Sequence, residues 1–242
     1  TAALQLGVDV YRSLETDQRT QAGLYLAHAR SSGKVWHFDG GLAGSNALTS
    51  TSLGGYWTRY FESGAYLDVV GQYSYHALDS SSTRMPVVKT HGDSLALSIE
   101  GGRSFAVAPR WIIEPQLQLR VQRGSLNSSQ DIAGQVNFGD INSLNARAGL
   151  RVAYMKDSST MWGRIDLRHE FDGRSTTRVS NLQGAYGVDV PASLHGSTIG
   201  LTGGIDSKLN RNTALYASAN IEQRLGGRGQ SVGAKVGVKF EW

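Results

Sequence analysis

Apolar and polar residues alternate along most of this 242-residue chain, and this alternation limits the possible folds more than any other feature. In the closing stretch, SVGAKVGVKFEW, even positions carry Val, Ala, Phe and Trp, while odd positions carry Ser, Gly, Lys and Glu. A period of two places alternate side chains on opposite faces of a β-strand. The stretch is therefore predicted to be a strand with one apolar and one polar face.

The same alternation recurs from end to end, and eleven such strands can be counted with no convincing helix. In LQLGVDVY the apolar face is supplied by Leu4, Leu6, Val8 and Val10. Tyr11 falls with Asp9 on the polar face. The other stretches contain AGLYLAHA, SLGGYWTR, YLDVVGQYSY, SLALSIEGG, WIIEPQLQLRVQ, LNARAGLRVAY, GRIDLRHEF, TIGLTGGID and LYASANIEQR. Regularly spaced amphipathic strands indicate an all-β architecture.

Two all-β architectures use this pattern. The apolar face points into the core of a soluble sandwich, whereas in an outer-membrane barrel it meets lipid and the polar face lines the lumen. Short connections alternate here with long polar ones at 30–47, 78–93, 123–142 and 172–194, which is typical of outer-membrane barrels. The predicted strands run about ten residues or more, near the length that crosses a bilayer at a tilt.

Aromatic residues on the apolar positions gather beside the short turns, as at the headgroup level of a membrane; they include Trp57, Phe105, Trp111, Tyr154, Phe240 and Trp242. We therefore predict a transmembrane antiparallel up-and-down β-barrel forming a single domain over residues 1–242. A soluble β-sandwich is the alternative.

The composition argues against several kinds of chemistry. Cysteine is absent, and the six histidines lack the spacing of a metal site. The net charge of +4 is spread along alternating positions, so no nucleic-acid partner is expected. GDS at 92–94 and GGRGQ at 226–230 lack the strand-to-helix context of a nucleophile elbow or a phosphate loop. We expect no catalytic residue, no cofactor and no metal.

Several stretches, in their order and spacing, resemble the C-terminal translocator domain of monomeric (type Va) autotransporters. They are LQLGVDVY, AGLYLAHARSSG, LGGYWTRYFESGAYLDVVGQYSYH, SLALSIEGGRSF, WIIEPQLQLRV, LNARAGLRVAY and VGVKFEW. The resemblance implies a twelve-stranded monomeric barrel in the outer membrane of a Gram-negative bacterium. Such a barrel anchors an N-terminal passenger, supports its export to the cell surface, and holds a linker helix in its lumen.

Family barrels have a helix and one strand ahead of LQLGVDV, so the resemblance implies that both lie upstream and that eleven of twelve strands are visible. The partners it implies are the lipid and lipopolysaccharide bilayer, the protein's own linker helix and passenger, and the barrel-assembly machinery. The terminal strand resembles the signal that this machinery reads, which Val236, Val238, Phe240 and Trp242 would carry. These four residues are equally interpretable as lipid-facing side chains of the closing strand.

The polar face collects charged and amide residues that we predict to face the lumen and to contact the linker helix or passenger. The set is Glu100, Glu114, Gln116, Gln118, Arg120, Arg147, Arg151, Arg164, Asp166, Arg168, Glu222 and Arg224. A structural network that stiffens the wall is one interpretation. The resemblance implies another, in which acidic residues such as Glu100 and Glu114 assist self-cleavage of the helix. An outer-membrane porin, or a barrel enzyme of the protease or lipase kind, is the alternative function.

Overall fold

The computed structural model describes residues 1–15, 18–83, 87–130, 132, 134–210, 212–227 and 229–240, with Leu14 and Glu15 described by their backbone alone. Throughout these residues the regular structure is antiparallel β-sheet. None of them belongs to a helix long and apolar enough to cross a membrane.

Eleven strands of the described chain form one continuous meander, in which each strand pairs with the next one along it. They are β1 (Ala2–Glu15), β2 (Gln18–Trp36), β3 (Leu42–Tyr60), β4 (Ala65–Ser82), β5 (Val88–Arg103), β7 (Trp111–Leu126), β10 (Ile141–Lys156), β11 (Ser159–Glu170), β14 (Gly196–Lys208), β15 (Thr213–Arg224) and β16 (Gln230–Phe240). The short β6 (Phe105–Ala108) pairs with the start of β7. The predicted up-and-down topology and the eleven strands are confirmed.

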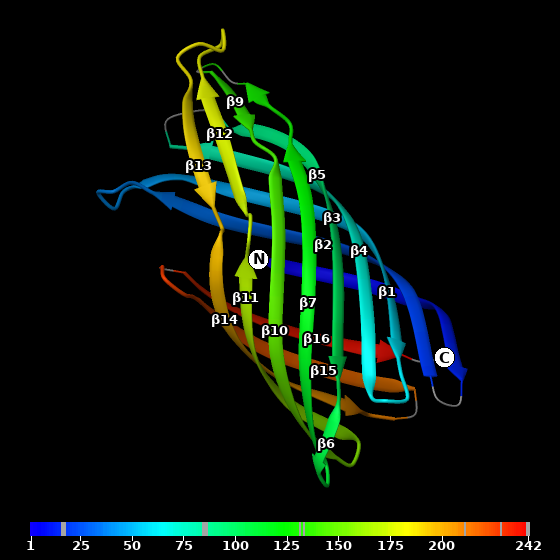
Figure 1. The fold of residues 1–242 in the computed structure, drawn as a ribbon. Coiled ribbons are helices and arrows are strands. Elements are labelled where there is room, and N and C mark those ends of the chain that lie inside the picture. Colours follow the sequence, from blue (N-terminus) through cyan, green and yellow to red (C-terminus); the bar gives the residue numbers. More distant parts are fainter. Residues whose placement is uncertain are drawn as a thin grey trace.

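A second, four-stranded sheet is built from two of the long connections. It contains β8 (Ser129–Gln130), β9 (Gln135–Phe138), β12 (Arg174–Ser180) and β13 (Val188–Ser193), in the order β13–β12–β9–β8. In Figure 1 this sheet stands at the upper end of the molecule, opposite β6. We call its side the loop end, and the side of the turns 61–64 and 157–158 the short-turn end.

The long connections are shorter than the sequence predicts. The segment 30–47 is strand up to Trp36 and again from Leu42, and the segment 78–93 is strand up to Ser82 and again from Val88. β2 and β3 each reach 19 residues in this way. These extensions carry polar residues on both faces, as in SSGK or HALDSSS, so the alternation that marks a half-apolar strand fades although the hydrogen-bonded ladder continues.

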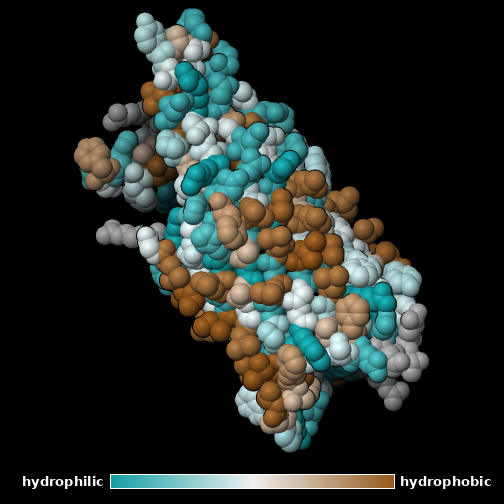
Figure 2. All heavy atoms as spheres, in the orientation of Figure 1, coloured by the Kyte–Doolittle hydropathy of each residue, from teal (hydrophilic) through white to brown (hydrophobic). Residues whose placement is uncertain are grey.

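The sheet is polar inside and apolar outside. Ala153 is the one buried hydrophobic residue recorded for the described chain. The buried polar residues are Ser52, Thr58, Ser74, Thr90, Ser94, Glu114, Gln116, Arg147, Asp166 and Ser180. Large apolar side chains such as Leu6 and Leu117 stay 69% exposed, and Figure 2 shows hydrophobic residues gathered over the middle and lower part of the visible surface. This inverted distribution is the one expected of a barrel wall in lipid.

One register irregularity corrects the sequence prediction for Tyr11. A bulge between Asp9 and Tyr11 inserts an extra residue into β1, so that Tyr11 pairs with Ala22. Ala22 shares the outward face with Leu24, and Tyr11 is 55% exposed. The prediction that Tyr11 lies on the polar face was wrong, because an extra residue in one strand reverses the alternation beyond it.

The two edge strands of the meander leave a seam. β1 and β16 are its first and eleventh strands, so both run toward the short-turn end. No backbone ladder joins them in the described chain, and the sheet therefore curls into an incomplete barrel. Across the seam the Lys239 ammonium lies 3.6 Å from the Asp9 carboxylate, which also accepts a hydrogen bond from the Tyr56 hydroxyl.

Aromatic side chains lie across glycines of the neighbouring strand on the lumenal face. A Cβ at Gly54 would lie 2.1 Å from the Tyr25 ring, and one at Gly237 would lie 2.1 Å from the Tyr216 ring. The Tyr25 hydroxyl then reaches the Gln72 side chain on the next strand, at 2.9 Å. Glycine at 54 thus allows one aromatic side chain to cross three strands.

Gly54→Val is expected to displace Tyr25 and break its bond to Gln72, lowering the free energy of unfolding by about 2 kcal/mol. Urea titration of the folded fraction, followed by electrophoretic mobility without boiling, measures the loss. Gly71→Val is the matched control, because Gly71 sits on the adjacent strand with nothing within 4 Å of an added Cβ. Equal losses from both substitutions would contradict this account.

Candidate functional site: the polar lumen

Arg147 is the most connected charge of the lumen. It lies on β10 and is 4% exposed. Its Nη2 donates to Glu100 Oε2 on β5 at 2.6 Å, and its Nε and Nη1 donate to Gln118 and Gln116 on β7 at 3.0 and 3.2 Å. Every guanidinium nitrogen therefore has a partner, and three strands are joined through one side chain.

The carboxylates around Arg147 have further donors. Glu100 also accepts from the Tyr66 hydroxyl at 2.6 Å. Glu114 accepts from Gln116 at 2.7 Å and from the Ser104 hydroxyl. The two candidates for assisting self-cleavage are thus held in an extended hydrogen-bond network, an arrangement that stiffens the wall.

A second cluster surrounds Asp166 on β11, whose side chain is fully buried. Its carboxylate lies 3.3 Å from Arg164 and 2.9 Å from Arg168, and Arg168 continues to Glu222 on β15 at 2.5 Å. Glycines make room for it, since a Cβ at Gly200 would lie 3.3 Å from both Asp166 oxygens. Opposite charges along β11, and across to β15 two strands away, therefore neutralise one another inside the barrel.

The two clusters meet over β10. A Cβ at Gly149 would lie 2.9 Å from Arg147 Nη1 and 3.5 Å from Asp166 Cβ. Arg151 lies 4.0 Å from both Glu114 and Asp206, and its guanidinium stacks 5.0 Å from the centre of the Trp162 ring. The lumen is thus lined by a connected set of charges rather than by isolated groups.

The predicted lumenal set is brought together in large part. Ten of its members belong to these two clusters, namely Glu100, Glu114, Gln116, Gln118, Arg147, Arg151, Arg164, Asp166, Arg168 and Glu222. Two lie apart: Arg120 donates to Gln122 on its own strand at 2.7 Å, and Arg224 donates to the His195 carbonyl at 2.7 Å.

Sequence reasoning missed Tyr66 and Trp162 as members of the network. The signal was available, because both occupy the polar positions of their strands. Trp162 donates from its indole nitrogen to Asp206 at 2.7 Å. An aromatic residue on the polar face of a barrel strand is a candidate lumenal hydrogen-bond donor.

The terminal strand has the predicted orientation. Val236, Val238 and Phe240 are 73%, 50% and 64% exposed, on the outward positions of β16. Trp242 lies outside the described residues. The orientation agrees with the interpretation as lipid-facing side chains and does not test the assembly signal.

The lumen offers no arrangement typical of a metal site. In the part of the chain that the structure describes, no group of three or more His, Cys, Asp or Glu residues could hold an ion. The geometry suits a polar wall made rigid by hydrogen bonds and ion pairs among its own side chains.

An antiparallel meander with a charged interior and an apolar exterior defines the class of transmembrane β-barrel proteins. Within that class the sequence matches the family described as Autotransporter beta-domain over residues 1–220. The chain belongs to this autotransporter β-domain family.

Relatives and solved structures agree with the family. The chain is 31% identical over 214 residues to the pertactin autotransporter of Bordetella parapertussis, covering 77% of this chain and 22% of that protein. It is 27% identical over 187 residues to the BrkA autotransporter of Bordetella pertussis, covering 72% and 18%. The chain thus spans about a fifth of the length of these curated relatives. The transport unit of the autotransporter AIDA-I from Escherichia coli has the same fold, with a TM-score of 0.87 at 18% identity over 99% of this chain and 82% of that one.

Replacing Arg147 tests the network. Arg147→Met leaves the Glu100 carboxylate without its main partner and should lower the free energy of unfolding by about 3 kcal/mol. Urea titration of the folded fraction measures this loss. Arg178→Met is the control, because Arg178 pairs with Asp189 at 3.5 Å with both side chains more than half exposed, and should change stability by less than about 0.5 kcal/mol. A loss at Arg147 no larger than at Arg178 would show that the lumenal network adds nothing to stability.

Proposed function

We propose that this domain is a translocator of the Gram-negative outer membrane, which anchors the protein as a monomer and supports export of an N-terminal passenger. The observation that carries the proposal is the inverted barrel wall, whose apolar residues face outward around a charged lumen. Membership of the autotransporter β-domain family supports the same role. The identity and activity of the passenger lie outside this domain.

We further propose that the seam between β1 and β16 takes a strand supplied by the protein's own upstream segment. Both edges run in the same direction, so a single strand of opposite direction would pair with each of them. In lipid an unpaired edge is costly, because no water can satisfy its N–H and C=O groups. The bilayer therefore favours closure of the seam.

We propose that the lumenal set contacts a linker helix that enters from the same upstream segment. Arg147 and Asp166 are paired within the wall. Arg120 is exposed on the polar face, and its one hydrogen bond among the described residues is to Gln122 on its own strand. The lumenal residues that lie outside the two clusters are thus better placed to contact a helix than the buried ones. We propose no reaction catalysed by the domain itself.

Surface display tests the translocator role. A reporter is placed ahead of the native upstream segment of the full-length protein, and its cleavage by protease added to intact cells is measured. We expect most of the reporter to be accessible while the barrel migrates as a folded species. A folded barrel with the reporter retained in the periplasm would overturn the proposal. So would a steady ion conductance across planar bilayers that the upstream segment does not block, which is the behaviour of a porin.

The terminal strand offers a matched test of the assembly signal. Phe240→Ser and Val232→Ser each remove an outward apolar side chain from β16, and Val232 is 74% exposed. If the barrel-assembly machinery reads the end of the strand by strand addition, Phe240→Ser lowers the assembled fraction about threefold and Val232→Ser far less. The measurement is the amount of folded barrel in isolated outer membranes. Equal effects of the two substitutions would contradict the assembly signal and would leave these residues as lipid-facing side chains of the closing strand.

A further inference from the structure

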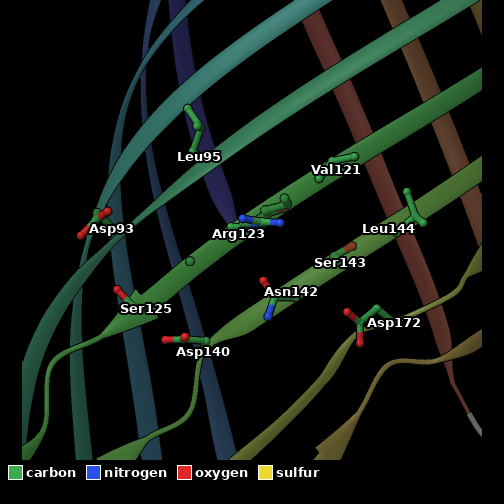
Figure 3. A pocket seen from close by; sticks show the side chains of 12 residues that line it. Asp93, Leu95, Val121, Arg123, Ser125, Asp140, Asn142, Ser143, Leu144 and Asp172 are labelled. Carbon is green, nitrogen blue, oxygen red and sulfur yellow. The ribbon is translucent and has the colours of Figure 1, made fainter.

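A hollow of about 800 Å³ lies on the outward face of the barrel, where β5, β7 and β10 reach the loop end. Figure 3 shows its lining, which comes from these three strands and from the segment that follows β11. The hollow lies on the opposite side of the wall from the lumenal network, since Leu95, Val121 and Leu144 of its lining occupy exposed outward positions.

The lining is apolar on one side and charged on the other. Val121 pairs with Leu97 on β5 and Leu144 on β10, in the outward row that ends the apolar band. In the next outward row toward the loop end, Arg123 pairs with Leu95 and Asn142. Beyond them lie Asp93, Ser125 and Asp140, whereas Asp172 lies beside Ser143, as Figure 3 shows.

The charged residues of the hollow have no partner within the described part of the chain. Neither the Arg123 guanidinium nor the carboxylates of Asp93, Asp140 and Asp172 take part in any hydrogen bond or ion pair there. The lumen differs, because Arg147 and Asp166 are surrounded by partners. A cation and several carboxylates that line one hollow without bonding to each other remain available to an external ligand.

The hollow also lies where the apolar band meets the polar loops. Tyr75 pairs with Asp93 across β4 and β5, and its ring lies 6.0 Å from that of His91. Phe171, 53% exposed, donates its backbone N–H to the Leu144 carbonyl. Aromatic residues beside the last apolar row mark the headgroup level of a bilayer.

We propose that this hollow binds a phosphorylated glycolipid of the outer leaflet. Its acyl chain lies over Leu95, Val121 and Leu144, and its phosphate is held by the guanidinium of Arg123. The hydroxyls of its sugar donate to the carboxylates of Asp93 and Asp140. The inference rests on the proposed outer-membrane location.

Hydrogen-bonding complementarity favours a glycolipid over a phospholipid whose headgroup is phosphate alone. Arg123 is the one basic residue among the described lining residues, against three aspartates. A headgroup with phosphate alone would pair with Arg123 but would offer no hydrogen-bond donor to the three carboxylates of the lining. A phosphorylated sugar supplies hydroxyl donors for these carboxylates as well as the phosphate.

Native mass spectrometry of the full-length protein in mild detergent tests the site, with monophosphorylated lipid A as the probe. Arg123→Gln removes the charge-assisted bonds to phosphate and should lower the bound fraction about tenfold. Ser125→Trp keeps Arg123 but fills the hollow, and should lower it similarly. Arg103→Gln is the control, since Arg103 ends β5 at the short-turn end, stacked 5.1 Å from the Phe105 ring, and should retain lipid A as the native protein does.

Phosphatidic acid, whose headgroup is phosphate alone, should fail to displace lipid A at equal concentration. Equal retention by Arg123→Gln and the native protein, or displacement by phosphatidic acid, would overturn the proposal. Electrophoretic mobility without boiling confirms that each variant is folded before binding is measured. Because the readout needs only a folded barrel, its failure would leave the export function untouched, and that function is judged separately by the reporter on cells.

Discussion

The pairing of backbone groups is the constraint on which the rest of this structure depends. In a bilayer each N–H and C=O must find a partner within the protein, since the hydrocarbon offers none. The meander meets this demand by long ladders between consecutive strands, such as the one from Arg19↔Tyr60 to Trp36↔Leu42. The demand is unmet along the described seam, where β1 and β16 each have a neighbour on one side alone. The proposed strand addition follows from that single deficit.

Once the apolar side chains face outward, the interior has to be filled by polar ones, and their charges have to be balanced locally. Arg147 and Asp166 show how this is done. Both are buried, and Arg147 has a carboxylate and amides from two other strands around it, whereas Asp166 lies between two arginines of its own strand. Gly149 and Gly200 contribute to this arrangement, because their missing side chains leave space over the sheet for Arg147 and Asp166. The lumenal network is thus the core of an inside-out protein, and residues at its margin, such as Arg120, are left for partners.

The alternation in sequence predicts the eleven strands, their faces and the ten clustered lumenal residues, because the side-chain period of a strand is a local property. It cannot predict that Arg147 meets Glu100, since contact across β5, β7 and β10 depends on the register of two ladders. It misplaces Tyr11, because a bulge leaves no mark in the alternation itself. It also underestimates the strands at the loop end, where water on both faces removes the apolar signal while the ladder continues to form.

The two faces of the barrel wall have different proposed roles, since one lines the lumen and the other faces the lipid. The lumenal charges are largely satisfied within the protein, as expected where their role is to hold a shape. At the outward hollow the Arg123 guanidinium and three carboxylates have no partner among the described residues, and aromatic residues beside them mark the proposed headgroup level. Charged side chains on the outward face destabilise a barrel when they contact hydrocarbon, and they are tolerated beside polar headgroups. In the proposed outer-membrane setting these charges therefore favour a depth that keeps them beside the headgroups, and a bound glycolipid would stabilise that depth.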